Sequence, residues 1–209
     1  VPLWDSVFNQ KLKKDTAKLL IRKFFEVITA PDFEKGALEL LRSKKNLIVI
    51  KVKKTKYDIE ERTFFGGKLI QDVNHKVSNV EEIYGVNKLN KEKLIFFVSI
   101  LKVIKSNAIA LFDNDSLVAQ SGGQTSRVDA LQNCLNKFKI KSNIKKYKNL
   151  FLFSDAFFPF TDSLSIIKRQ KSKFNVYAPM GSKNDAKIFS YINKYKLNFI
   201  KLSDRHFKH

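Results

Sequence analysis

The sequence has few of the residues that build disulfide frameworks and metal sites. Among its 209 residues are one cysteine, Cys134, and three histidines. A single cysteine excludes an internal disulfide framework and any zinc site made of several cysteines, and it fits a reducing cytoplasm. The histidines lack metal-ligand spacing with enough further partners for zinc. We therefore expect a cytoplasmic protein with no structural zinc.

Long apolar runs are also missing. The longest, residues 94–101, is too short to cross a bilayer and is typical of a buried helix. The N-terminal residues show no basic segment followed by an apolar one, as a secretory signal would have. We expect no membrane partner. Hydrophobic residues make up 44% of the chain and aromatic residues 12%, which is enough for a folded core.

Acidic residues are scarce beside basic ones, with 20 Asp and Glu against 40 Lys and Arg, so the net charge is +20. Such an excess favours polyanionic partners. Most of these cations are lysines, scattered in short groups over predicted loops and solvated faces. We therefore expect no nucleic-acid partner. The alternative, a basic RNA-binding protein, predicts binding that weakens as salt is raised.

Helical and strand patterns alternate, which indicates an α/β fold. We predict residues 1–75 as one part, 76–105 as a connecting helical segment and 106–209 as a second part. Asp32, Asn90, Asp162 and Asn184 are expected to cap helices. Predicted helices cover 15–25, 34–42, 91–105, 126–138 and 186–195. Predicted strands cover 27–29, 46–52, 108–112, 116–119, 150–153, 174–177 and 198–201, with a polar loop over 53–62 and an irregular ribbon over 64–73.

An aromatic loop follows the predicted buried strand 150–153. It reads Ser154-Asp155-Ala156-Phe157-Phe158-Pro159-Phe160, which suits neither an amphipathic helix nor an alternating strand. In open α/β sheets ligands bind beyond the carboxyl ends of strands, so a site is expected here. The alternative is an aromatic corner of the core.

Two further segments carry candidate binding groups. Gly122-Gly123-Gln124-Thr125-Ser126-Arg127 joins a strand to a helix start, where backbone N–H groups and Arg127 can meet an anion, although no P-loop lysine follows. A glycine turn with a solvated arginine is the alternative. Arg205-His206-Phe207-Lys208-His209 gathers two of the three histidines, and a frayed chain end is the alternative there. His75 lies in a polar loop and is expected to be solvated.

Four segments of the chain can be compared together, in the order in which they occur. They are Ser106-Asn107-Ala108-Ile109, Gly123-Gln124-Thr125-Ser126-Arg127-Val128, the aromatic loop, and Arg205-His206-Phe207-Lys208-His209. Together they resemble the signature blocks of the AICAR transformylase domain of bifunctional purine-biosynthesis proteins, which join a formyltransferase to an IMP cyclohydrolase. Three earlier blocks resemble it too: Phe25-Glu26-Val27-Ile28-Thr29-Ala30-Pro31, Leu38-Glu39-Leu40-Leu41 and Gly66-Gly67-Lys68-Leu69-Ile70-Gln71-Asp72.

The resemblance implies cytidine-deaminase-like three-layer α/β units with mixed sheets, the first only partly present, in a homodimer. It also implies formyl transfer from 10-formyltetrahydrofolate to AICAR ribotide. Residues matching the family's nucleotide contacts are Glu26, Asn107, Arg127, Phe157, Arg205 and His209. Those matching its folate contacts are Val128, Asp162, Gly181 and Ser182. Ser106 and Asp155 match, incompletely, the position of a potassium ion in the family.

The sequence also departs from the family pattern. It contains no Lys-His-x-Asn-Pro-Cys-Gly motif, which carries the family's catalytic pair, and no cyclohydrolase domain. Its opening residues match the family's Ser-x-Phe-Gly segment but lack the glycine. We therefore expect an N-terminally incomplete transformylase domain that is inactive alone. The alternative is a non-catalytic nucleotide-binding partner or pseudo-enzyme.

Overall fold

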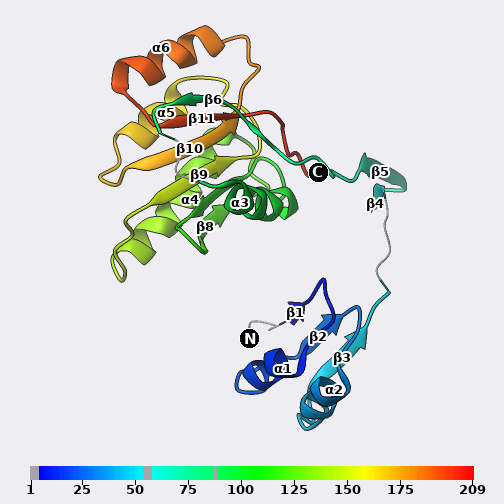
Figure 1. Cartoon of the computed structure of the whole chain (residues 1–209). Helices are drawn as coiled ribbons and strands as arrows, with labels where there is room; N and C mark the ends of the chain where they lie inside the picture. The colour runs from blue at the N-terminus through cyan, green and yellow to red at the C-terminus, as the bar shows by residue number, and fades with distance from the viewer. Residues whose placement is uncertain (1–4, 54–57, 87–88) are drawn as a thin grey trace. The chain divides into compact units, whose positions relative to one another are not determined.

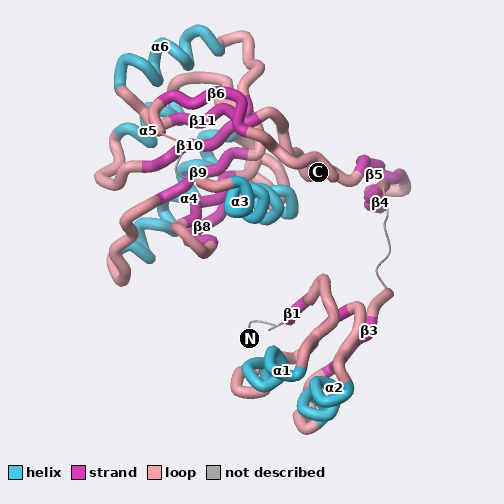
Figure 2. The backbone as a smooth tube through the Cα atoms, viewed as in Figure 1, coloured by secondary structure: helices cyan, strands magenta, loops and turns pink. Residues whose placement is uncertain are grey.

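The structure, a computed structural model, describes residues 5–53, 58–86 and 89–209. The chain divides into two compact units, Val1–Ile70 and Gln71–His209 (Figures 1 and 2). Residues 1–4 of the altered opening segment and 54–57 of the predicted polar loop lie outside the described residues. Each unit is an α/β structure, as predicted, and the second has a mixed sheet. In the described ranges no helix is long and apolar enough to cross a bilayer.

The first unit is a parallel sheet with two helices on one face. The strands run in the order β1-β2-β3, and the helices pack on β2 through Ala17, Ala37 and Leu41 against Ile28 and Ala30. Helix α1 ends five residues before the predicted end. After Ile21 the backbone N–H groups bond to carbonyls three residues back, as that of Lys23 does to Leu20, and not four residues back as in an α-helix. Its elements are β1 Asp5–Val7, α1 Lys14–Leu20, β2 Val27–Ala30, α2 Lys35–Arg42 and β3 Ile48–Lys51.

The other face of this sheet is open in the described part of the chain. Register places Val7 and Ile50 beside Thr29 on one face, and all three strands are parallel. Val7 is 77% exposed and Ile50 41%. Asp32 does not cap α2 as expected, because Glu34 occupies the cap position. The carboxylate of Asp32 pairs instead with Lys51 at 2.7 Å and with Lys11 at 3.1 Å.

A two-stranded hairpin ends the first unit, and only its last two residues, Gln71 and Asp72, belong to the second. Strands β4 (Ile59–Phe64) and β5 (Gly67–Asp72) meet at Phe65 and Gly66, whose φ angles of 40° and 79° suit a tight hairpin turn. The prediction of a loop through residue 62 is therefore wrong for Ile59–Arg62, where polar side chains obscured a strand exposed on both sides.

The second unit contains a six-stranded mixed sheet in the order β6-β11-β10-β9-β7-β8. Residues 76–105, predicted as a connecting segment, contribute β6 and α3 to this unit. Asn90 caps α3 as predicted, its Oδ1 accepting from the Lys93 N–H at 2.9 Å. The elements are β6 Val80–Tyr84, α3 Lys91–Val103, β7 Ile109–Phe112, β8 Leu117–Ser121, α4 Arg127–Ser142, β9 Leu150–Ser154, α5 Asp162–Lys168, β10 Phe174–Pro179, α6 Asp185–Tyr195 and β11 Phe199–Leu202.

Helices cover both faces of this sheet. One core joins α4, α5 and α6 to the face bearing Leu111, Leu152 and Val176. The other joins α3 to the opposite face, where Phe97 stacks on Phe112 with ring centroids 4.2 Å apart. Burial on both faces explains why the central strands are apolar at most positions.

All six strands direct loops to one edge of the sheet. Parallel strands β9, β10 and β11 end there, and β7 starts there because it is antiparallel to β9, with Ile109 opposite Ser154. Strand β8 ends opposite Ile109, and β6 begins opposite Leu202. The loops at this edge are therefore 73–79, 106–108, 122–126, 155–161, 180–184 and 203–209.

Candidate functional site

The shared edge of the second sheet carries all but one of the predicted site residues. Residues 106–107 precede β7, Arg127 and Val128 begin α4, and the aromatic loop follows β9. The 181–182 turn follows β10, and Arg205 and His209 follow β11. Loops distant in sequence converge here because the strand register gives them one edge.

A buried ion pair forms the innermost part of this edge. Nη1 of Arg127 donates to Oδ1 of Asp155 and, at 3.2 Å, to the carbonyl of Ala108. Ser106 Oγ donates to the other carboxylate oxygen. Asp155 is 0% exposed and Arg127 7%, so each charge depends on the other for compensation. Nε of Arg127 is buried and has no hydrogen-bond partner in the described structure.

The implied potassium ion fits this arrangement poorly. Both oxygens of Asp155 already accept hydrogen bonds, and the guanidinium of Arg127 balances its charge. A further cation beside Arg127 would face like-charge repulsion.

Arg205 lies over the aromatic loop. Its guanidinium carbon is 4.5 Å from the centre of the Phe157 ring, and Nη2 donates to the Gly181 carbonyl at 3.2 Å. Arg205 is exposed, so its remaining N–H groups can reach a ligand. Arg205 and Arg127 thus contact positions two residues apart in one loop, Phe157 and Asp155.

Asn107 faces the glycine turn. Its side-chain N–H donates to the Gln124 carbonyl at 3.0 Å, and the two backbones bond at 3.4 Å and 3.5 Å. This pairing fixes Asn107 at the shared edge, and the Gln124 carbonyl orients its side-chain amide.

The predicted folate residues lie around the same edge. The N–H groups of Gly181 and Ser182 are bound by Asp185 at 2.8 Å and 2.9 Å, which orders their turn. Asp162 is the first residue of α5 rather than its cap, and its Oδ1 accepts from the Ser163 N–H at 2.6 Å. Val128 is half-buried in the first turn of α4.

Asn184 adds a connection between two of these loops. It stands at the cap position of α6 but makes no side-chain cap bond. Its Nδ2 donates instead to the Pro159 carbonyl at 3.0 Å, tying the 180–184 turn to the aromatic loop.

Sequence reasoning gave no role to His206, which anchors the C-terminal segment. It is 0% exposed. Asn74 Nδ2 donates to its Nδ1 at 3.0 Å, which puts the ring proton on Nε2, 2.5 Å from Ser78 Oγ. Burial, and secondarily the charge of Lys102, lowers the His206 pKa to about 4, so the ring is neutral. No local pattern in the sequence marks a contact that spans more than 120 residues.

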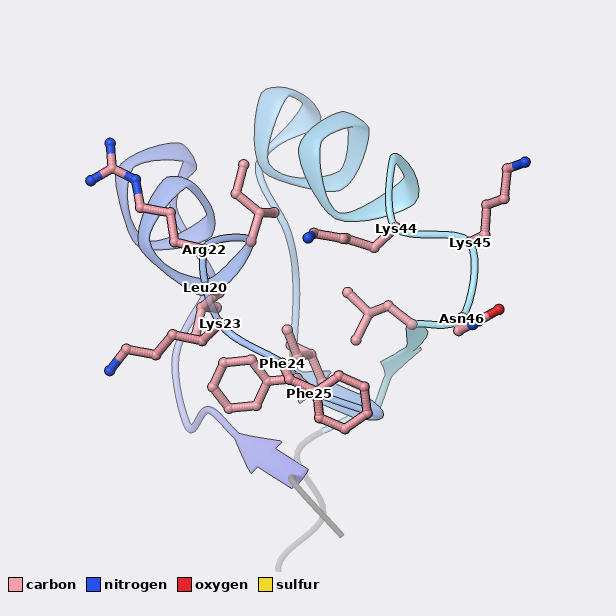
Figure 3. A pocket seen from close by; sticks show the side chains of 11 residues that line it. Leu20, Arg22, Lys23, Phe24, Phe25, Lys44, Lys45 and Asn46 are labelled. Carbon is pink, nitrogen blue, oxygen red and sulfur yellow. The ribbon is translucent and has the colours of Figure 1, made fainter. Parts of the chain in front are cut away.

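Glu26 is the one predicted residue in the first unit. Its Oε2 is buried and has no hydrogen-bond partner in the part of the chain that is described. The neighbouring Phe25 lines a cavity of about 430 Å³ between the C-terminal ends of α1 and α2 (Figure 3).

The cations around this cavity have a structural explanation. Lys44 points into it, while Arg22, Lys23 and Lys45 point away (Figure 3). Positive charges are favourable at helix C-termini, and both helices end here. The predicted site residues do not line this cavity.

Comparison with known proteins gives consistent matches. The family model described as AICARFT/IMPCHase bienzyme matches residues 6–137. The chain is 36% identical over 206 residues to the bifunctional purine biosynthesis protein PurH of Fusobacterium nucleatum, covering 97% of this chain and 40% of that protein. It is 36% identical over 209 residues to PurH of Bacteroides thetaiotaomicron, covering 97% and 41%, and 33% identical over 213 residues to PurH of Buchnera aphidicola, covering 97% and 40%.

The chain therefore spans about two fifths of the length of these relatives. The family model covers well over half of the chain, and its match begins in the first unit and continues into α4 of the second. The coverage by the family model, together with relatives 33–36% identical over 97% of the chain, shows that the chain belongs to the AICARFT/IMPCHase bienzyme family.

Proposed function

We propose that this chain contributes nucleotide- and folate-binding residues to formyl transfer from 10-formyltetrahydrofolate to AICAR ribotide, a step of purine biosynthesis. The observation that carries the proposal is the exposed Arg205 guanidinium held between the Phe157 ring and the Gly181 carbonyl. A fixed, exposed cation beside an aromatic face suits a phosphorylated heterocycle. Family membership supplies the substrate class.

The two arginines suit different parts of the nucleotide. Arg205 has an exposed charge, which fits the phosphate. The charge of Arg127 is already balanced by Asp155, but its buried Nε–H is unpaired. Because its charge is already compensated, Arg127 suits the uncharged carboxamide region of the nucleotide better than the phosphate. Asn107 and Phe157 would orient the aminoimidazole, with His209 near the amine and Glu26 on the nucleotide.

The amine of AICAR ribotide is a weak nucleophile, because the neighbouring carboxamide withdraws its electron density. Formyl transfer therefore needs orientation of the amine, a proton acceptor and stabilisation of the oxyanion on the formyl carbon. These 209 residues contain no Lys-His-x-Asn-Pro-Cys-Gly motif to supply the acceptor. We propose that the chain alone binds nucleotide without turnover.

The co-substrate and assembly follow from the same resemblance. Val128, Asp162, Gly181 and Ser182 would contact the folate, whose glutamate tail suits a basic protein of net charge +20. The proposal includes cytidine-deaminase-like units, a cytoplasmic location and a homodimer.

Calorimetry with AICAR ribotide tests this proposal. The wild-type chain is expected to release heat on binding, and Arg205→Ala to bind at least tenfold more weakly. Arg169→Ala is the matched control, because Arg169 is exposed and its Nε bonds only its own helix, at Ser165 O. Absence of binding by the wild-type chain, or equal affinity in Arg205→Ala, would overturn the proposal.

A second candidate is a non-catalytic nucleotide-binding partner, which would use the same exposed Arg205 guanidinium beside the Phe157 ring. Both candidates predict nucleotide binding. They differ when a polypeptide carrying the motif is added together with 10-formyltetrahydrofolate: restored turnover supports the transferase, and continued inactivity supports the partner.

A further inference from the structure

We propose that Gln71 is a positioning residue that fixes the C-terminal segment 205–209 at the candidate site. The role in ligand binding rests on the proposed function above, while the role in ordering the segment does not. The residues are separated by more than 130 positions in sequence, and their contact depends on the fold of the second unit.

The side-chain amide of Gln71 binds two backbone groups of the segment. Its Nε2 donates to the Phe207 carbonyl at 2.8 Å, and its Oε1 accepts from the His209 N–H at 3.0 Å. These are the two groups that residues flanking Lys208 present on one side of an extended chain. The amide therefore acts as a neighbouring strand would, with one donor and one acceptor.

Ser106, which also binds the buried ion pair, holds the opposite side of the segment. The Lys208 carbonyl accepts from the Ser106 N–H at 2.8 Å. Ser106 Oγ in turn donates to Asp155, whose carboxylate binds Arg127. Gln71 thus lies at the outer end of a continuous series of hydrogen bonds that leads to a predicted nucleotide-binding residue.

Other residues of the 71–79 segment also bind the chain after β11. Asn74 and Ser78 bind the ring of His206, and Asn79 N–H donates to Ser203 Oγ at 3.0 Å. His206 is buried, so the inner end of the segment is anchored without Gln71. His209 is exposed, and its backbone N–H donates to Gln71 Oε1. Gln71 therefore holds the outer end from one side, opposite the Ser106 N–H that binds the Lys208 carbonyl.

Amide NMR relaxation of the whole chain tests the inference. In the wild-type protein the N–H groups of Phe207 and His209 are expected to have order parameters near the rigid value of about 0.85, and in Gln71→Ala to fall below about 0.6. The thermal midpoint is expected to stay within about 2 °C of wild type, because the core is untouched. Gln132→Ala is the matched control, since that exposed glutamine bonds Asn136 on its own helix.

Gln71→Glu separates the two hydrogen bonds. It keeps an acceptor for the His209 N–H and removes the donor to the Phe207 carbonyl, so Phe207 is expected to loosen more than His209. Unchanged order at residues 207–209 in Gln71→Ala would overturn the inference, as would equal loosening in Gln132→Ala.

Affinity for AICAR ribotide tests the ligand-binding part. Gln71→Ala is expected to bind about tenfold more weakly than wild type, with Gln132→Ala unchanged. If the wild-type chain does not bind, the proposed function fails, and the relaxation result still decides whether Gln71 orders the segment. If Gln71→Ala loosens the segment and binds as tightly as wild type, the segment is not part of the nucleotide site.

Discussion

Gly181 approaches Arg205 so closely that a Cβ atom on Gly181 would lie 2.7 Å from Nη2 of Arg205. Its φ of 115° is also rarely adopted by residues with a side chain. The glycine therefore allows the guanidinium to reach the Gly181 carbonyl while lying over Phe157.

Gly181→Ala is expected to displace Arg205 and to weaken AICAR ribotide binding about tenfold, at a stability cost of about 1–3 kcal/mol from the strained backbone. Calorimetry and urea unfolding measure the two effects. Gly67→Ala is the control, because its φ is ordinary and its nearest contact is 3.5 Å away. Binding by Gly181→Ala at wild-type strength would show that this approach does not position Arg205.

Removal of Arg127 is expected to leave the Asp155 carboxylate buried without a counter-charge. Arg127→Met should lower the free energy of unfolding by about 3–5 kcal/mol, and the double variant with Asp155→Asn should recover much of that loss. Urea denaturation measures both. Arg42→Met, at an exposed position, should change stability by less than about 0.5 kcal/mol. A single variant as stable as this control would contradict a buried ion pair.

His206 makes stability depend on pH. Its folded-state pKa of about 4 lies below the ordinary 6.5 because of burial first and Lys102 next; Lys76 lowers it further and Asp204 opposes them. Between these two values the unfolded chain binds more protons than the folded one. The free energy of unfolding should therefore fall by about 3 kcal/mol as pH drops from 7 towards 4.

Urea denaturation at a series of pH values measures this dependence. His206→Gln removes the titrating group and should flatten the profile in that range, although its stability at pH 7 will be lower. A wild-type profile as flat as that of His206→Gln would show that the imidazole does not resist protonation.

Two lysines cover the unpaired side of β8, the last strand of the six-stranded sheet. Lys137 donates to the Gln120 carbonyl at 2.9 Å, and Lys141 to the Val118 carbonyl at 2.6 Å. Unpaired strand edges promote association, and lysines suppress it. Replacement of both by methionine should raise the average mass seen in concentration-dependent sedimentation above that of the wild type, whereas Lys139→Met should not. Equal masses in the double variant and wild type would show that this edge needs no such cover.

The second half of the fold was largely predictable because its signals are local. Apolar runs predicted β7, β9 and β10, and Asn90 marked the start of α3. Strand β6 was missed because Glu81 and Glu82 give it a polar pattern, which an edge strand tolerates. It is stabilised there by pairing with β11 and by the Lys201–Glu81 ion pair at 3.1 Å.

The sequence by itself determined the family, the alternation of helices and strands and the segments that carry site chemistry, because each depends on neighbouring residues. Only the tertiary structure decided the partners of those segments. It placed Arg127 on Asp155, 28 positions away, and Gln71 on His209, 138 positions away. Such pairs depend on the strand order and register that bring six loops to one edge of the sheet, and no local pattern encodes that convergence.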